Sequence, residues 1–125
     1  MPVKRVFIVD DDPMMCEMVR GHLEKKFRYD IHVFNTGEEC IENLHLDPQV
    51  IILDYELNSI VTHAEDGLHI LQRIKKADTN ICVIMLSSQT HYGKATQTIM
   101  KGALEYVVKD DNAFNSIDKI LESLK

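Results

Sequence analysis

The chain has 125 residues, of which 45% are hydrophobic and 27% are charged, so it can form one domain with a buried core. Its net charge of −6 argues against direct binding to nucleic acid or to an acidic membrane surface. Three widely spaced cysteines in apolar surroundings are typical of reduced thiols. We find no signal-peptide pattern and no apolar run of membrane-spanning length, and we therefore expect a cytoplasmic protein.

The first half of the chain alternates between short apolar runs and helical periodicity. Residues 6–9 form an apolar run typical of a buried strand, and Pro13 then suits the first turn of a helix that ends near residue 27. Met14, Met15 and Met18 are interpreted as packing residues of this helix. A weaker strand is expected at 31–34. Thr36 precedes Glu39 as in a capping box and predicts a second helix start.

The second half repeats the alternation three times. Strands are expected at 50–53, 81–86 and 104–108, and helices at 66–76, 92–101 and 113–124, with Gly102 ending the middle helix. Five strand–helix units predict a doubly wound α/β domain of the flavodoxin-like type over residues 1–125. Its sheet is expected to be parallel, in the order 2-1-3-4-5, with helices on both faces.

Polar residues follow four of the five expected strands. The first strand ends in three aspartates at 10–12, the third in Asp54, the fourth in Ser87 and Ser88, and the fifth in Lys109. In a doubly wound sheet, the carboxyl ends of the strands form the functional crevice. Carboxylates there suit a hard divalent cation, and one of them can act as a nucleophile toward a phosphoryl group. A hydroxyl and an ammonium group can then contact the phosphoryl oxygens.

With these residues in place, the chain resembles the receiver domain of bacterial two-component response regulators. The resemblance runs from "VFIVDDDP" through "IILDYEL", "EDGLHIL" and "VIMLSSQ" to "KGALEYVVKDD". It implies that Asp54 is the phosphoacceptor. It also implies that Asp10, Asp11, Asp54 and the backbone carbonyl of Glu56 bind Mg²⁺ or Mn²⁺, with Asp10 acting through water.

The resemblance further implies contacts to the phosphoryl group and a conformational switch. Ser87 and Lys109 match the residues that contact the phosphoryl oxygens, and the small Ser88 leaves room for the group. Ser87 and Tyr106 match the residues whose rearrangement accompanies activation. Asp12 is interpreted differently, as the N-cap of the helix that Pro13 opens.

The implied function is a phosphorylation switch rather than an enzyme with an external substrate. The phosphoryl donor would be a sensor histidine kinase or a phosphotransfer protein. The output would be a changed surface on the fourth helix, fifth strand and fifth helix, which controls an effector protein or an output domain and can also form a homodimer. This domain itself is expected to contact neither nucleic acid nor a membrane.

Two features depart from the common receiver pattern. The segment from Asp54 to Gly67 is several residues longer than usual, and we interpret residues 58–65 as a mobile flap beside the site. Asp110 stands where proline usually follows the lysine, which leaves the isomer of the Lys109–Asp110 bond open.

Three other functions fit parts of the sequence. A receiver-like docking module that takes no phosphate is the first. A phosphatase of the haloacid dehalogenase type would use Asp10 and Asp12 as nucleophile and acid, but no acidic pair ends the fourth strand. A flavodoxin-like flavin module shares the expected topology, but three aspartates after the first strand would repel a phosphate.

Overall fold

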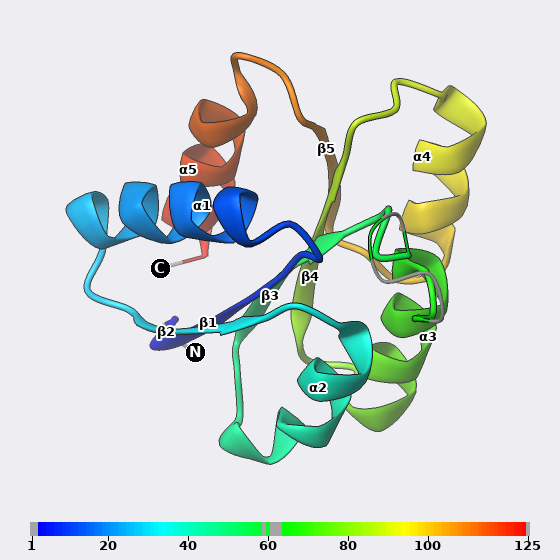
Figure 1. The fold of residues 1–125 in the computed structure, drawn as a ribbon, viewed down its shortest axis with the longest axis horizontal. Coiled ribbons are helices and arrows are strands. Elements are labelled where there is room, and N and C mark those ends of the chain that lie inside the picture. The colour runs from blue at the N-terminus through cyan, green and yellow to red at the C-terminus, as the bar shows by residue number, and fades with distance from the viewer. Residues whose placement is uncertain (1–2, 59, 61–63, 125) are drawn as a thin grey trace.

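The computed structural model describes residues 3–58, 60 and 64–124, and Figure 1 shows strands and helices alternating around one sheet. The strands are β1 (Arg5–Val9), β2 (Asp30–Phe34), β3 (Val50–Asp54), β4 (Cys82–Ser87) and β5 (Glu105–Val108). The helices are α1 (Pro13–Lys26), α2 (Gly37–Glu42), α3 (Gly67–Ala77), α4 (Tyr92–Met100) and α5 (Ala113–Ser123), with a 3-10 helix, η1, at Leu44–Leu46. The predicted succession of elements is confirmed, with ends shifted by a residue or two.

The strands pair in the order β2-β1-β3-β4-β5, and every neighbouring pair is parallel. The doubly wound fold predicted from the sequence is therefore confirmed. In the central register, Ile52 of β3 lies between Ile8 of β1 and Ile84 of β4. Because all strands run the same way, the residues that end them meet at one edge of the sheet. No described helix combines the length and the apolar character that crossing a bilayer requires.

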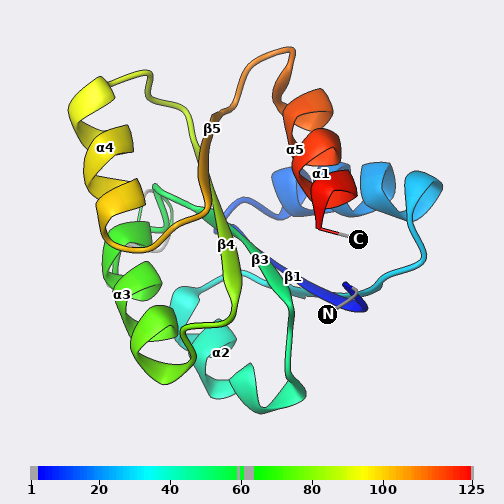
Figure 2. The same cartoon turned by 180° about the vertical axis from the view of Figure 1, so that it is seen from behind.

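Helices cover both faces of the sheet, as the two opposite views in Figures 1 and 2 show. Alternate residues of β1 enter separate apolar cores: Val6 and Ile8 pack with α1 and α5, whereas Phe7 and Val9 pack with α2 and α3. This double coverage explains why β1 is a continuous apolar run rather than an alternating one. The two cores fix the sheet edge at which the polar strand ends lie.

The helix starts predicted from the sequence are confirmed at the two N-caps. The Asp12 side chain accepts a hydrogen bond of 3.0 Å from the amide of Met14, and Pro13 occupies the first turn of α1. Thr36 Oγ1 accepts a bond of 3.2 Å from the amide of Glu39 at the start of α2. Each bond satisfies an amide that the first turn of a helix leaves without a partner.

The interpretation of the α1 methionines as packing residues is wrong for Met14 and Met18, which are 72% and 52% exposed. The buried stripe of α1 consists of Cys16, Val19 and Leu23, at spacings of three and four residues. Met18 precedes Val19 by one residue, which rotates it by about 100° around the helix axis and away from the core. Met15 shares the stripe and packs against the core.

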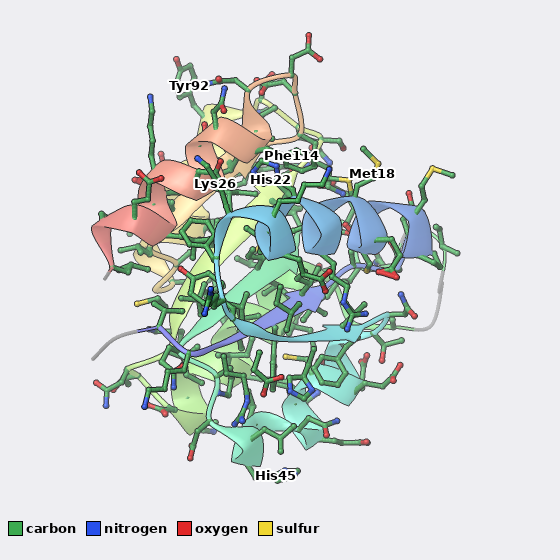
Figure 3. All side chains as sticks on the ribbon, turned by 90° about the vertical axis from the view of Figure 1, so that its left-hand side faces the viewer. Met18, His22, Lys26, His45, Tyr92 and Phe114 are labelled. Atoms are coloured by element: carbon green, nitrogen blue, oxygen red, sulfur yellow. The ribbon has the colours of Figure 1, made fainter. Side chains whose placement is uncertain are left out.

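Helices α1 and α5 are also joined by a polar cluster, part of which is labelled in Figure 3. Nε2 of His22 lies 2.9 Å from both carboxylate oxygens of Asp118, and Nζ of Lys26 lies 3.1 Å from one of them. The His22 ring stacks on Phe114 with centroids 4.7 Å apart. Asp118 is buried, so these two partners compensate a carboxylate that water does not reach. The contact between His22 and Asp118 was not predicted from the sequence.

Candidate functional site

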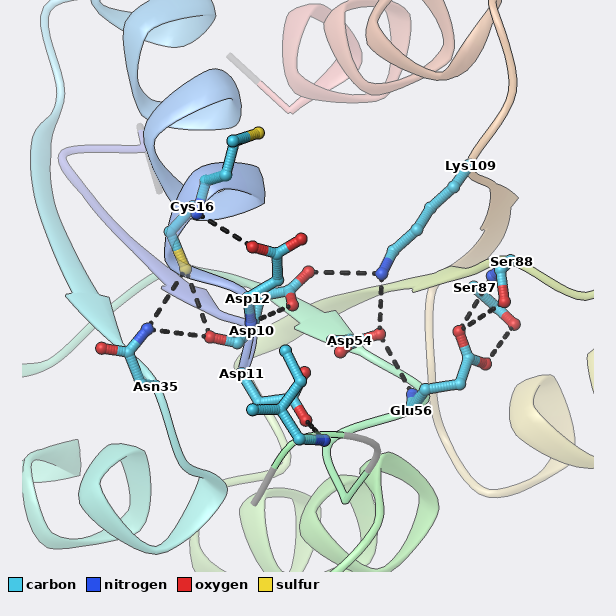
Figure 4. Close-up of polar contacts among 12 residues, drawn as sticks. Asp10, Asp11, Asp12, Cys16, Asn35, Asp54, Glu56, Ser87, Ser88 and Lys109 are labelled. Carbon is cyan, nitrogen blue, oxygen red and sulfur yellow. Dashed lines mark hydrogen bonds and ion pairs between the residues drawn. The ribbon is translucent and has the colours of Figure 1, made fainter. Parts of the chain in front are cut away.

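Three carboxylates meet at the carboxyl edge of the sheet (Figure 4). Asp10 and Asp11 follow β1 and Asp54 ends β3, and all three are buried. Each offers an oxygen within 4.8 Å of those of the other two. The side chain of Asp12 is turned to the start of α1 instead, where it caps the helix. The structure thus separates the three consecutive aspartates into a buried pair and an N-cap.

Lys109 places its ammonium group between two of these carboxylates. Its Nζ lies 3.0 Å from Oδ1 of Asp54 and 3.3 Å from Oδ2 of Asp10. No peptide bond between described residues is cis, so Lys109 reaches both aspartates with a trans bond to Asp110. Burial alone would lower the pKa of Lys109, but the charges of Asp54 and Asp10 outweigh it and raise the pKa. The two carboxylates therefore favour the charged form of Lys109.

The ionised form of Asp54 is disfavoured in spite of this lysine. Burial, and after it the charge of Asp10, raises the pKa of Asp54 to about 7, whereas Lys109 and the amide of Glu56 act in the opposite direction. The Glu56 amide donates a bond of 3.0 Å to Asp54 Oδ1. One ammonium group faces three carboxylates, so the site favours a further positive charge.

Backbone amides hold the carboxylates in place. The amide of Asp12 donates to Asp10 Oδ1 at 2.9 Å, and the amide of Ile60 donates to Asp11 Oδ2 at 2.8 Å. The second bond ties the long segment after β3 to the acidic cluster. Of the flap proposed from the sequence, residues 59 and 61–63 lie outside the described part of the chain.

Gly67 explains how α3 approaches the backbone of Asp54 so closely. A Cβ atom at this position would lie 2.3 Å from the carbonyl oxygen of Asp54 and 2.7 Å from Cα of Tyr55. The Gly67 amide donates a bond of 3.0 Å to the carbonyl of Tyr55, and Asp66 caps the helix through the amide of His69. The start of α3 therefore packs directly against the end of β3, where Asp54 lies.

The end of β4 contacts the side chain of Glu56. Ser87 Oγ donates to Glu56 Oε2 at 2.7 Å, and the Ser88 amide and hydroxyl donate to Oε1 at 2.9 and 3.0 Å (Figure 4). Sequence reasoning assigned a role to the backbone carbonyl of Glu56 and missed this use of its carboxylate. The sequence shows only that an acidic residue stands two positions after Asp54, and this does not indicate which residues its side chain contacts.

Tyr106 lies on β5 beside the segment that follows Ser88. Its hydroxyl donates a bond of 2.9 Å to the carbonyl of Gln89, and its ring contacts Tyr55 edge-on with centroids 6.2 Å apart. The backbone amide of Gln89 in turn donates a bond of 3.1 Å to Ser87 Oγ. The β4–α4 connection is thereby hydrogen-bonded to the aromatic side chain of β5.

The donor set fits a hard divalent cation. Asp10, Asp11 and Asp54 supply carboxylate oxygens, the ligand type that Mg²⁺ and Mn²⁺ prefer, and their mutual repulsion would be relieved by such a charge. Among the described residues, the ligands in this cluster are all carboxylate oxygens, which suit Mg²⁺ or Mn²⁺ better than zinc. The described histidines form no ligand set; His69, for example, bonds to the exposed cap of α3.

A family model described as the response regulator receiver domain matches residues 6–122. The chain is 31% identical over 113 residues to the protein named Probable C4-dicarboxylate response regulator DctR of Halalkalibacterium halodurans, covering 86% of this chain and 46% of that protein. It is 27% identical over 122 residues to the chemotaxis protein CheY of Listeria monocytogenes, covering 97% of this chain and 95% of CheY.

Solved structures give the same fold. The RcsB response regulator of Salmonella typhimurium superposes with a TM-score of 0.85 at 23% identity, covering 99% of this chain and 60% of that one. The chain also spans only 26% of the transcriptional regulatory protein ZraR of Escherichia coli, which it matches at 24% identity. Several relatives are thus much longer than the matched region.

Proposed function

Because the chain belongs to the family of response regulator receiver domains, we propose that it is a signalling switch controlled by phosphorylation of Asp54. The observation that carries this proposal is the group of buried Asp10, Asp11 and Asp54 with the half-buried Lys109 at the carboxyl ends of β1, β3 and β5. Such a group combines a nucleophile, oxygen ligands and a fixed cation in one place.

In the proposed reaction, an oxygen of Asp54 attacks the phosphorus of a phosphohistidine on a sensor kinase or phosphotransfer protein. The P–N bond breaks as the O–P bond forms, and its electron pair returns to the imidazole nitrogen. Asp10, Asp11, Asp54 and the Glu56 carbonyl would hold Mg²⁺ or Mn²⁺, which neutralises charge on the phosphoryl oxygens when bound.

Other residues would stabilise the product. Lys109, now paired with Asp54 and Asp10, would move its charge to a phosphoryl oxygen, and Ser87 would donate its hydroxyl to another. Ser88 is small enough to leave space for the group. Tyr106, through Gln89, would carry the change to the surface of α4, β5 and α5. That surface would bind an effector, an output domain or a second copy of the chain.

Intact-mass spectrometry after incubation with acetyl phosphate and Mg²⁺ tests this proposal. We expect an adduct of one phosphoryl group that hydroxylamine removes and that Asp54→Asn abolishes. Asp12→Asn is the matched control, because asparagine also caps helices, and it should form the adduct as the unmodified chain does.

The alternatives predict different outcomes of the same experiment. A folded protein that forms no adduct and binds no beryllofluoride would be a docking module that works without phosphorylation. Continuous turnover of p-nitrophenyl phosphate, lost in Asp10→Asn, would instead identify a phosphatase.

A further inference from the structure

The carboxylate of Glu56 accepts three hydrogen bonds from Ser87 and Ser88 at the end of β4. Ser87 Oγ lies 2.7 Å from Oε2, and the amide and hydroxyl of Ser88 lie 2.9 and 3.0 Å from Oε1. Glu56 itself follows Asp54 by two residues and donates its amide to Asp54 Oδ1. One side chain thus connects the loop after β3 with the end of β4.

The donors of Ser87 and Ser88 that contact Glu56 have no further proton to offer to another acceptor. A serine hydroxyl carries one proton, and Ser87 Oγ already accepts from the amide of Gln89. The single proton of Ser87 Oγ is donated to Glu56, and the hydroxyl and amide protons of Ser88 are donated to it as well. A second anion at this position finds both hydroxyls and the Ser88 amide occupied unless Glu56 leaves.

A phosphoryl group on Asp54 would be such an anion. Asp54 and Leu86 are register partners on β3 and β4, so Ser87 is the first residue beyond the nucleophile on the neighbouring strand. We propose that the Glu56 carboxylate is an internal stand-in for the phosphoryl group, which occupies the Ser87 and Ser88 donors in the resting state and is displaced on phosphorylation. This inference deepens the proposed function and rests on it.

Two physical consequences follow. Displacement of Glu56 costs three hydrogen bonds to a charged acceptor, and charge-assisted bonds are about twice as strong as neutral ones. The departing carboxylate and the arriving phosphoryl group also repel each other at close range. Glu56 therefore opposes occupancy of Asp54 by any tetrahedral anion, and it sets the threshold at which the switch responds.

The contact also extends to Tyr106. The Gln89 amide bonds to Ser87 Oγ, and the Gln89 carbonyl accepts from the hydroxyl of Tyr106. Residues 87–89 are thus held by Glu56 at one end and by Tyr106 at the other. Release of Glu56 frees Ser87 to move toward Asp54, and this movement alters the bond that positions Tyr106.

Beryllofluoride titration in saturating Mg²⁺ tests the inference, because beryllofluoride binds an aspartate oxygen as a tetrahedral anion. The amide resonances of Ser88 and Lys109 report binding by NMR. We expect Glu56→Ala to bind about tenfold more tightly than the unmodified chain, which corresponds to the loss of about one net charge-assisted bond. Glu56→Gln, which keeps one acceptor, should lie between the two. Glu42→Gln, an exposed position at the end of α2, is the matched control.

A second readout needs neither metal nor beryllofluoride. In Glu56→Ala the free protein should show the Ser88 amide proton shifted upfield, since its charged acceptor is gone. Glu56→Gln removes the charge but keeps the volume of the side chain and all donors of Ser87 and Ser88; it should tighten beryllofluoride binding about two- to threefold, so the inference stays testable if Glu56→Ala does not fold.

The outcomes separate this inference from the proposed function. Absence of beryllofluoride binding in the unmodified chain and in all variants would overturn the proposed function. Equal affinities for the unmodified chain, Glu56→Ala and Glu56→Gln, with binding intact, would overturn the role of Glu56 alone.

Discussion

The close approach of Gly67 to the Asp54 backbone makes Gly67→Ala a sharp test of how the site is supported. The added Cβ would lie 2.3 Å from a carbonyl oxygen and 2.7 Å from a backbone carbon, whereas real Cβ atoms essentially never come within 3.0 Å of such atoms. The obstructing atoms belong to the main chain of Asp54 and Tyr55, so no side-chain rotation relieves the clash. Either α3 or the end of β3 must move.

The expected magnitude follows from measured overpacking. Extra methylene groups in packed regions cost about 1–3 kcal/mol, and the reduced freedom of the unfolded chain returns about 0.4–1 kcal/mol. We therefore expect Gly67→Ala to lower the free energy of unfolding by about 1.3 kcal/mol. A urea m-value of about 2 kcal/mol/M converts this to a midpoint lower by about 0.7 M.

Gly21→Ala is the matched control, because Gly21 lies inside α1 and an added Cβ there meets nothing within 4 Å. The same substitution should raise stability by about 0.5–1 kcal/mol at this position, because alanine favours the helix. Urea denaturation followed by circular dichroism measures both. Gly67→Ala at least as stable as the unmodified chain would refute the reasoning, as would equal losses at the two sites.

Three further predictions concern the cap, the charge and the thiols. Asp12→Ala should lower the free energy of unfolding by about 1 kcal/mol through loss of the α1 cap, while Mg²⁺ affinity measured by calorimetry stays the same; a lost Mg²⁺ response would make Asp12 a ligand. The pKa of Asp54 is about 7 in the folded chain and near 3.8 in the unfolded chain, so the folded state binds more protons between these values and its stability falls as pH rises from about 4 to 7. In EDTA, Asp54→Asn should therefore gain on the order of 2 kcal/mol more at pH 8 than at pH 5, and equal gains in urea melts at both pH values would contradict this. Burial raises the pKa of the Cys16 and Cys40 thiols to about 12, whereas Cys82 is partly exposed. Iodoacetamide at pH 8 should therefore modify only Cys82 in the native protein and all three cysteines in urea. Mass spectrometry of the peptides locates the adduct, and modification of Cys16 or Cys40 in the native protein would contradict this.

The fold could be predicted from the sequence because the apolar runs and the helix-start residues indicate the same order of elements. Apolar runs at 6–9 and 81–86 indicate strands covered on both sides, and Pro13 after Asp12 indicates a helix start. Where a single residue has to be assigned to a helix face, the pattern is weaker. Met18 is apolar and stands beside Val19, and only the packing against α5 and the sheet decides which of the two is buried.

The candidate site was predictable to the extent that strand ends determine it. Asp10, Asp54 and Lys109 converge because parallel strands end at one edge, and the resemblance supplied their expected roles. The contacts of the Glu56 and Asp118 carboxylates were missed for a different reason. Each carboxylate belongs to a charged residue whose importance depends on partners distant in the sequence, Ser87 for the first and His22 for the second. Periodicity does not encode such pairs.

The strand order has a consequence for synthesis of the chain. β1 emerges from the ribosome first, yet its place is between β2 and β3, and β3 is not covered until β4 arrives. At 5–20 residues per second, Val6–Val9 waits about 2–10 s for residues 50–54. During that time only β2 can pair with β1, and the other edge of this apolar strand stays open to other chains. We expect nascent chains that stop before β3 to depend on chaperones, whereas those that reach β4 begin to fold.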